Sequence, residues 1–136
     1  MEPQMNADER GFERGKMDLL TQKVIQCAFA VSNTLGCGFL EKVYENALAH
    51  ELRKAGLQVQ QQYGITVYYD GIAVGEYAAD LFVEGVLLVE LKAVKEFDDI
   101  HMAQCLNYLR ATKLRLCLLM NFGKPKLEVR RIANSY

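Results

Sequence analysis

Hydrophobic residues between Asp18 and Gly56 recur every three or four positions, which is the spacing of amphipathic helices. The spacing predicts a first helix that starts at Asp18, a residue able to cap it, and stops at Gly36. Gly36-Cys37-Gly38 makes a tight break, and a second helix then continues to about Gly56. The apolar positions of the two helices are Leu20, Val24, Cys27, Ala28, Val31 and Leu35, then Leu40, Val43, Tyr44, Ala47, Leu48 and Leu52.

Beyond these helices the pattern changes to the alternation that is typical of strands. Asp70-Gly71 lies between two such runs and is a strong hairpin signal. The run Val86–Ala93 is almost continuously apolar, which is typical of a central strand covered on both faces. A third helix, capped by Asp98 or Asp99, is predicted to extend through Ala111, so the fold class is α/β (α+β). The predicted strands are Leu57–Gln62, Ile65–Tyr69, Ile72–Phe82, Val86–Ala93, Leu114–Phe122 and Lys126–Ile132.

Length and composition favour one domain. The chain has 136 residues, of which 51% are hydrophobic, enough for one core and too few for two typical domains. Residues 1–16 are polar and are predicted to form a flexible N-terminal tail before a single domain over residues 17–136. No stretch approaches the roughly 20 apolar residues of a membrane span, so a cytoplasmic protein is expected. The four cysteines are scattered without a Cys-x-x-Cys pair, which disfavours a zinc site.

The net charge of -1 argues against a protein that coats nucleic acid indiscriminately. The C-terminal part is nevertheless basic, because Glu128 is the one acid after Arg110. This edge could contact a polyanion, although on charge alone a solvated surface is the favoured interpretation. The basic residues of this edge are Arg110, Lys113, Arg115, Lys124, Lys126, Arg130 and Arg131.

Three charged residues interrupt an otherwise apolar hairpin and mark a candidate active site: Asp80, Glu90 and Lys92. Glu90 and Lys92 share one face of their strand, because side chains alternate between two faces. Buried charges cost several kcal/mol unless they are paired or bind a metal. A three-residue turn, Val83–Gly85, would pair Asp80 with Leu88 and set it diagonal to Glu90, whereas a two-residue turn would point it away. We therefore predict the odd-length turn.

Two carboxylates on one face form an oxygen-only site that suits Mg²⁺ or Mn²⁺. Lys92 would lie beside the metal, where an ammonium can orient water and offset charge on a phosphate. The alternative is an ordinary Glu-Lys pair on an exposed strand, since Glu-x-Lys is common by itself.

Two helices carry further candidates. Glu41 stands in the first turn of the second helix, where the helix dipole favours a carboxylate, and Tyr44 follows one turn later. His101, Gln104 and Tyr108 form a polar stripe on the third helix. Taken alone, the first feature is a stabilised helix start, and stripes of the second kind usually face solvent.

These residues together resemble the GxxExxY family of the PD-(D/E)xK nuclease superfamily, over about Leu19–Ile132. Residues 38–44, Gly-Phe-Leu-Glu-Lys-Val-Tyr, fit Gly-x-x-Glu-x-x-Tyr, and Asp80, Glu90-Leu91-Lys92 and Gln104 follow in order. The likeness extends to His101-Met-Ala-Gln-Cys-Leu-Asn-Tyr-Leu and to Leu119-Met-Asn-Phe-Gly.

The resemblance implies a central mixed β-sheet flanked by helices, with an αβββαβ core like that of restriction endonucleases. It implies that Asp80 and Glu90 bind the metal and that Lys92 lies beside the attacking water. It also implies that Glu41 is a further acidic ligand, direct or through water.

In the same resemblance, Gln104 supports the site from the following helix. Tyr44, Tyr108 and His101 complete the expected supporting set. The chain departs from the family's name motif at Ala79, which precedes Asp80 where that motif has Pro, and the superfamily tolerates this variation.

The predicted function is a Mg²⁺- or Mn²⁺-dependent phosphodiesterase that hydrolyses DNA or RNA with metal-activated water, with DNA favoured. A homodimer fits a nuclease that cuts two strands, although no sequence feature requires it. The alternative is a non-catalytic nucleic-acid or protein binding module that keeps the nuclease fold. A metal-dependent hydrolase of small nucleotides is a third interpretation.

Overall fold

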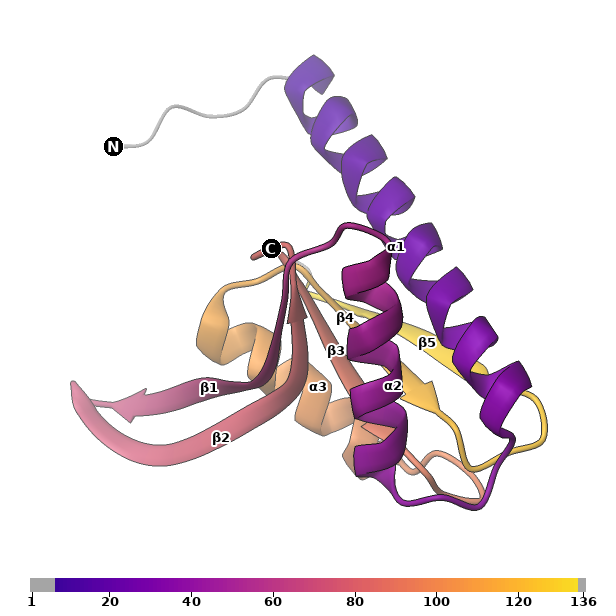
Figure 1. The fold of residues 1–136 in the computed structure, drawn as a ribbon. Helices are drawn as coiled ribbons and strands as arrows, with labels where there is room; N and C mark the ends of the chain where they lie inside the picture. The colour runs from indigo at the N-terminus through magenta and orange to yellow at the C-terminus, as the bar shows by residue number, and fades with distance from the viewer. Residues whose placement is uncertain (1–6, 135–136) are drawn as a thin grey trace.

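The computed structural model describes residues 7–134, which form a five-stranded mixed sheet covered by helices on both faces (Figure 1). The strands lie in the order β1-β2-β3-β4-β5, with β3 and β4 parallel and the other neighbours antiparallel. This arrangement confirms the predicted mixed sheet with flanking helices. The elements are α1 (Ala7–Leu35), α2 (Glu41–Lys54), β1 (Val59–Tyr69), β2 (Ile72–Val83), β3 (Leu87–Lys92), α3 (Asp99–Thr112), β4 (Leu116–Asn121) and β5 (Glu128–Ala133).

Two apolar clusters hold the layers together, because the inner strands expose apolar side chains on both faces. The first joins α1 and α2 to one face of the sheet, and Leu48, Leu81 and Leu118 are fully buried members of it. The second joins α3 to the other face through residues such as Leu109 and Leu119. Burial of all six residues of β4 fits the near-continuous apolar pattern of a central strand.

Helix α1 starts at Ala7, well before the predicted start at Asp18. The predicted flexible tail, residues 1–16, therefore includes helical residues from Ala7 onward, and residues 1–6 lie outside the described part. Residues 7–16 include one Ala, two Glu, two Arg and one Lys, which are good helix formers, beside two glycines, which are not. A helix nucleated by its packed part extends through such residues at small cost. No helix within residues 7–134 is both long and apolar enough to cross a membrane.

Strands β1 and β2 form a long hairpin that projects from the body of the molecule (Figure 1). Its turn is the predicted Asp70-Gly71, and both residues adopt left-handed backbone conformations with φ of 53° and 75°. Two separate strands were predicted before this turn, but β1 is continuous from Val59 to Tyr69. We call the projecting part, residues 63–79, the hairpin arm.

The turn between β2 and β3 has the predicted odd length but lies one residue later. Val83 pairs with Leu87, so the turn is Glu84–Val86 rather than Val83–Gly85. Val83 is completely buried, and a turn that began there would remove it from the core. Glu84 and Gly85 take left-handed conformations instead. This register places Asp80 opposite Glu90, not diagonal to it as predicted.

Candidate active site

Strands β2 and β3 separate at the candidate active site. Regular backbone pairing ends at Leu81 and Val89. At the next position, backbone N–H groups bond to carboxylate side chains instead of to carbonyl groups. The backbone N–H of Asp80 donates to Oε1 of Glu90 at 2.8 Å, and the N–H of Leu91 donates to Oδ2 of Asp80 at 2.8 Å. Two carboxyl groups therefore lie across the opening between the strands. We call Asp80 and Glu90 the carboxylate pair.

Burial makes the negative charge of the carboxylate pair unfavourable. Glu90 is 4% exposed, and burial, followed by repulsion from Asp80, raises its pKa to about 8 despite the nearby Lys92. Burial also raises the pKa of Asp80, against the hydrogen bonds from Leu91 and Gln62. Near neutral pH the pair therefore retains a proton that two solvated carboxylates would have lost.

A strained residue on β1 holds Asp80 from the other side. The β1-β2 ladder passes from Gln61 to Tyr63 and omits Gln62, whose φ is 55°. A left-handed conformation costs a residue with a side chain roughly 1–2 kcal/mol. The Gln62 amide donates to Oδ1 of Asp80 at 3.2 Å and to Oε1 of Glu45 at 2.6 Å. The strain therefore accompanies a link between β2 and α2.

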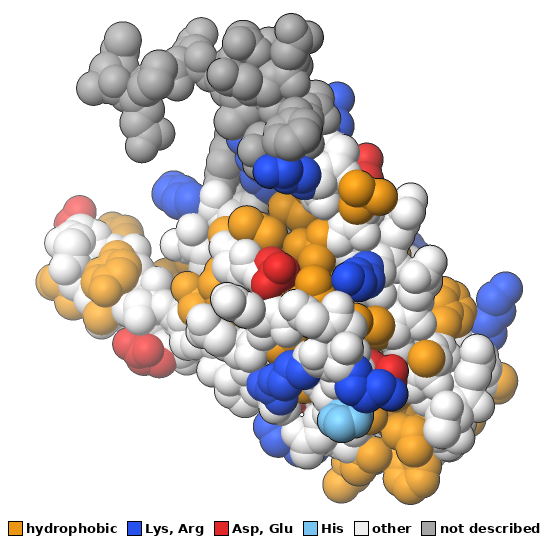
Figure 2. All heavy atoms as spheres, turned by 45° about the horizontal axis from the view of Figure 1, so that its top comes forward, with side chains coloured by type: hydrophobic (Ala, Val, Ile, Leu, Met, Phe, Trp, Pro, Cys, Tyr) orange, Lys and Arg blue, Asp and Glu red, His pale blue; other side chains and the backbone are white. Residues whose placement is uncertain are grey.

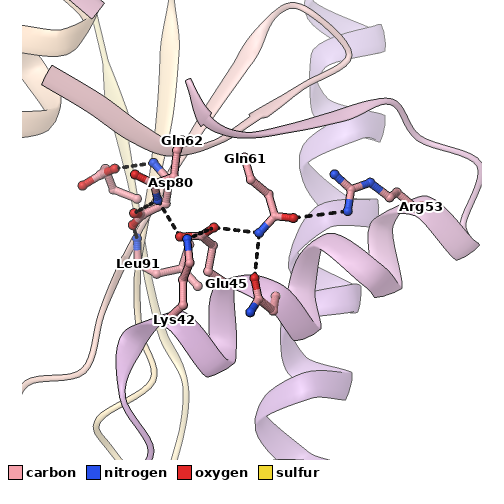
Figure 3. A network of polar contacts seen from close by, with 9 residues as sticks. Lys42, Glu45, Arg53, Gln61, Gln62, Asp80 and Leu91 are labelled. Atoms are coloured by element: carbon pink, nitrogen blue, oxygen red, sulfur yellow. Dashed lines mark hydrogen bonds and ion pairs between the residues drawn. The ribbon is translucent and has the colours of Figure 1, made fainter. Parts of the chain in front are cut away.

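Glu45 is the centre of that link (Figure 3). It is 2% exposed and accepts hydrogen bonds from Lys42 at 3.0 Å, Gln61 at 2.7 Å and Gln62. Sequence reasoning missed Glu45 and Gln62. The available signals were a glutamine run inside a strand and an acid directly after Tyr44 on the buried side of α2.

Glu41 is the first residue of α2 and is exposed. Its charge raises the pKa of both Asp80 and Glu90, so it lies near the carboxylate pair, but it is the last of the contributions to each. Across residues 7–134, no three His, Cys, Asp or Glu side chains are gathered closely enough to hold a metal ion together. Of the predicted acidic ligands, Asp80 and Glu90 therefore lie together. Glu41 is near them but does not complete a three-residue cluster.

Lys92 ends β3 and follows Glu90 by two residues, so both point to the same face. It lines a cleft of about 770 Å³ between the hairpin arm and α3, together with His101, Gln104 and Tyr108. The sequence-predicted stripe of α3 therefore faces this cleft. Gln104 Nε2 donates to the Tyr108 hydroxyl at 2.9 Å.

Tyr108 lies close to the carboxylate pair as well. Burial and then the charge of Glu90 raise the pKa of its hydroxyl to about 12. His101 has a second contact, because its Nδ1 accepts the backbone N–H of Asp98 at 3.0 Å and so caps the start of α3.

Tyr44 does not belong to the cleft. It is fully buried in the α1/α2 cluster, stacks on Phe122 with ring centroids 4.8 Å apart, and donates to the carbonyl of Gly36 at 2.7 Å. Its hydroxyl also accepts the N–H of Phe39 at 3.2 Å. Tyr44 therefore fixes the loop that leads into Glu41, which is an indirect support of the site.

A second buried polar residue, Asn121, fixes the chain after Lys92. It pairs with Lys92 in the parallel β3-β4 ladder, and its side chain bonds to the backbone N–H and carbonyl of Val94 at 3.1 and 2.9 Å. Gly123 is required beside it, because a Cβ there would lie 2.4 Å from the nitrogen of Val94. The motif Leu119–Gly123 thus holds the end of β3 in place.

Three of the seven basic residues of the C-terminal edge form ion pairs with acids of the described chain. Lys124 and Arg130 both contact Glu128, at 2.9 and 3.0 Å, and Arg131 contacts Asp18 at 3.2 Å. For Lys124, Arg130 and Arg131, these pairs favour the interpretation of a solvated surface.

The sequence model of the PD-(D/E)XK nuclease superfamily matches residues 18–132, and the chain belongs to this superfamily. The structure is similar in fold to an alkaline exonuclease from Laribacter hongkongensis, with a TM-score of 0.52 and 16% sequence identity. The match covers 69% of this chain and 56% of the exonuclease chain. No curated protein matches the sequence. Superfamily and fold support a nuclease-like function.

Proposed function

We propose that the protein hydrolyses phosphodiester bonds of nucleic acid with Mg²⁺ or Mn²⁺. The observation that carries this proposal is the meeting of Asp80 and Glu90 at the opening between β2 and β3, with Lys92 on the same face. Membership of a nuclease superfamily supports the reaction class. Within that superfamily, Gly38, Glu41 and Tyr44 support an assignment to the GxxExxY family.

The carboxylate pair fits a divalent cation. Asp80 and Glu90 offer oxygen donors, which Mg²⁺ and Mn²⁺ prefer, and a positive partner would offset the burial and repulsion that raise their pKa values. We assign both as ligands and Glu41 as a further acid that acts from α2. When bound, such a cation lowers the pKa of a coordinated water and polarises a phosphoryl oxygen.

Lys92 supplies a positive charge on the side of the cleft. Its ammonium can orient the attacking water and offset charge that develops on the phosphate. Gln104 also lines the cleft, and its hydrogen bond to Tyr108 restricts its side chain. We assign Lys92 as a catalytic residue and Gln104 as a group that contacts the substrate phosphate.

Gln62 and Glu45 are positioning residues in this proposal. The amide nitrogen of Gln62 donates to the carboxylates of Asp80 and Glu45. These contacts fix the orientation of the Asp80 carboxyl relative to α2. Groups that orient metal ligands typically change metal affinity or activity by roughly 10–100-fold when they are removed.

Cleavage assays on purified protein test the proposal. Single-stranded, double-stranded and branched DNA and RNA are incubated with Mg²⁺ or Mn²⁺, and Asp80→Ala and Lys92→Ala are compared with the parent. The exposed Lys95→Ala, three residues after Lys92, serves as the matched control. We expect cleavage by the parent and the control and none by the other two variants. Equal cleavage by all four proteins, or binding without cleavage by the parent, would contradict a catalytic role.

A further inference from the structure

The cleft beside Lys92 contains aromatic and basic groups that the reaction does not use. Tyr77 reaches it from the hairpin arm and is 54% exposed, while Tyr108 lies opposite on α3. Their ring centroids are 6.1 Å apart and their planes are inclined by 49°. The Tyr77 ring packs over Gly75, where a Cβ would lie 3.2 Å from it, so the glycine leaves room for the ring.

The charge of the cleft is unlike that of the arm. Lys92 and Arg110 give it positive charge, His101 adds a polar ring, and its described lining contains no Asp or Glu. Chain segment 55–91 has no Lys or Arg at all, so the cations come from β3 and α3 and the arm contributes the exposed ring. On the face drawn in Figure 2, the protruding arm carries hydrophobic and acidic side chains among other side chains and backbone. A polyanion would therefore follow the α3 side, with its planar groups toward Tyr77.

The size of the cleft limits what can enter. Its volume, about 770 Å³, is within the roughly 300–1,000 Å³ of small-molecule sites. One or two nucleotides fit such a space, whereas a base pair in a continuous duplex has no free ring face to stack on a tyrosine.

We propose that this cleft binds unpaired nucleotides next to the phosphate that is cleaved, with a base on Tyr77 and the phosphates toward Arg110 and His101. This inference rests on the proposed function, because it places the nucleotides beside a cleaved phosphate, and it names the substrate class as single-stranded nucleic acid or an unpaired end. Tyr77 is a substrate-binding residue here and takes no part in the chemical step.

Fluorescence anisotropy tests binding apart from cleavage. The full chain is titrated, in EDTA and in a parallel Ca²⁺ series, onto labelled single strands, blunt duplexes and duplexes with an unpaired overhang, in DNA and RNA forms. Tyr77→Ala is expected to weaken binding of the unpaired substrates by roughly 5- to 100-fold, which is the usual range for one lost base stack, and to leave blunt duplex binding unchanged. Tyr77→Phe keeps the ring and is expected to bind like the parent.

Tyr69→Ala is the matched control, since Tyr69 is 72% exposed on the same hairpin but does not line the cleft. The proposal is overturned if Tyr69→Ala causes the same loss, if Tyr77→Ala weakens all substrates equally, or if no oligonucleotide binds. A parent that binds single strands through Tyr77 but cleaves nothing would refute the nuclease and keep the cleft assignment. If the parent cleaves nucleic acid and Tyr77→Ala cleaves and binds equally well, the nuclease proposal stands and the cleft assignment is refuted.

Discussion

Replacing Glu90 by Gln is expected to stabilise the metal-free protein while it removes an essential group. Glu90 is buried, and its pKa is raised from 4.5 to about 8, first by burial and then by Asp80. The folded protein thus holds a proton that the unfolded chain releases. The contribution of Glu90 to stability is fully present below pH 4.5, falls as the pH rises from 4.5 to about 8, and then stays level.

The size of the effect follows from the same values. At about 1.36 kcal/mol per pKa unit, the change from 4.5 to about 8 corresponds to at most about 5 kcal/mol at high pH. Part of it belongs to Asp80, because the repulsion is shared by the pair. In Glu90→Gln, the carbonyl oxygen of the new amide can still accept the Asp80 N–H. We expect a gain of about 2–4 kcal/mol in unfolding free energy at pH 8 and almost none at pH 4.5.

Urea denaturation in EDTA, followed by circular dichroism at several pH values between 4.5 and 8, measures this gain. Glu96→Gln is the control, since Glu96 is exposed and has no hydrogen bond within the described residues. The parent and the control should lose stability as the pH rises, and Glu90→Gln should lose much less. The reasoning would be refuted if Glu90→Gln were less stable than the parent at pH 8. It would also be refuted if the unfolding free energies of the two proteins had the same dependence on pH.

Three further substitutions test how the site is held. Gln62→Gly is expected to relieve the left-handed strain of the strand but to lower cleavage about 10- to 100-fold, because Asp80 loses its amide contact; unchanged cleavage would exclude a positioning role. Tyr44→Phe should lower the unfolding free energy by about 1–3 kcal/mol in urea titrations and lower the cleavage rate per folded molecule less than Gln62→Gly does, since its hydroxyl holds the loop before Glu41 and does not reach the cleft; a larger loss of cleavage than in Gln62→Gly would contradict this indirect role. Gly123→Ala should destabilise the fold by about 3 kcal/mol or more because its methyl group would meet the Val94 backbone, and a thermal melt equal to that of the parent would contradict the close approach.

Much of the fold could be predicted from periodicity. The helical spacing before Gly56 and the apolar run of β3 identify elements that the structure contains, because both patterns follow from burial on one or both faces. The Asp70-Gly71 turn was identified by its local chemistry, since the two residues tolerate positive φ. Helix α1 was placed too late, because its N-terminal part lacks the apolar stripe on which the prediction relied.

The candidate site was predicted only in part. Asp80, Glu90 and Lys92 were visible because charge is unusual in a buried strand. Gln62 was not predicted, because its role depends on a left-handed backbone conformation that a glutamine in the sequence does not indicate. The proximity of Glu41 to the carboxylate pair depends on how α2 packs against the sheet, which a single sequence does not specify.

The register of the hairpin illustrates the same limit. Parity requires an odd turn to bring Asp80 to the side of Glu90, and the turn is odd. The turn lies one residue later than predicted because Val83 is buried in the apolar cluster that joins α1 and α2 to the sheet. That burial is a tertiary contact. That single residue decides whether the two carboxylates are diagonal or directly opposite.

Calorimetric titration with Mn²⁺ at pH 7 tests most directly whether the carboxylate pair, Asp80 and Glu90, holds the cation on which cleavage is proposed to depend. Because Glu90 retains its proton with a pKa of about 8, binding should release a proton, and the measured heat should change with the ionisation enthalpy of the buffer. We predict this buffer-dependent heat for the parent and for Glu96→Gln, and its loss in Glu90→Gln. The same Mn²⁺ heat in Glu90→Gln, or no heat in the parent, would contradict the assignment of the pair as the metal site.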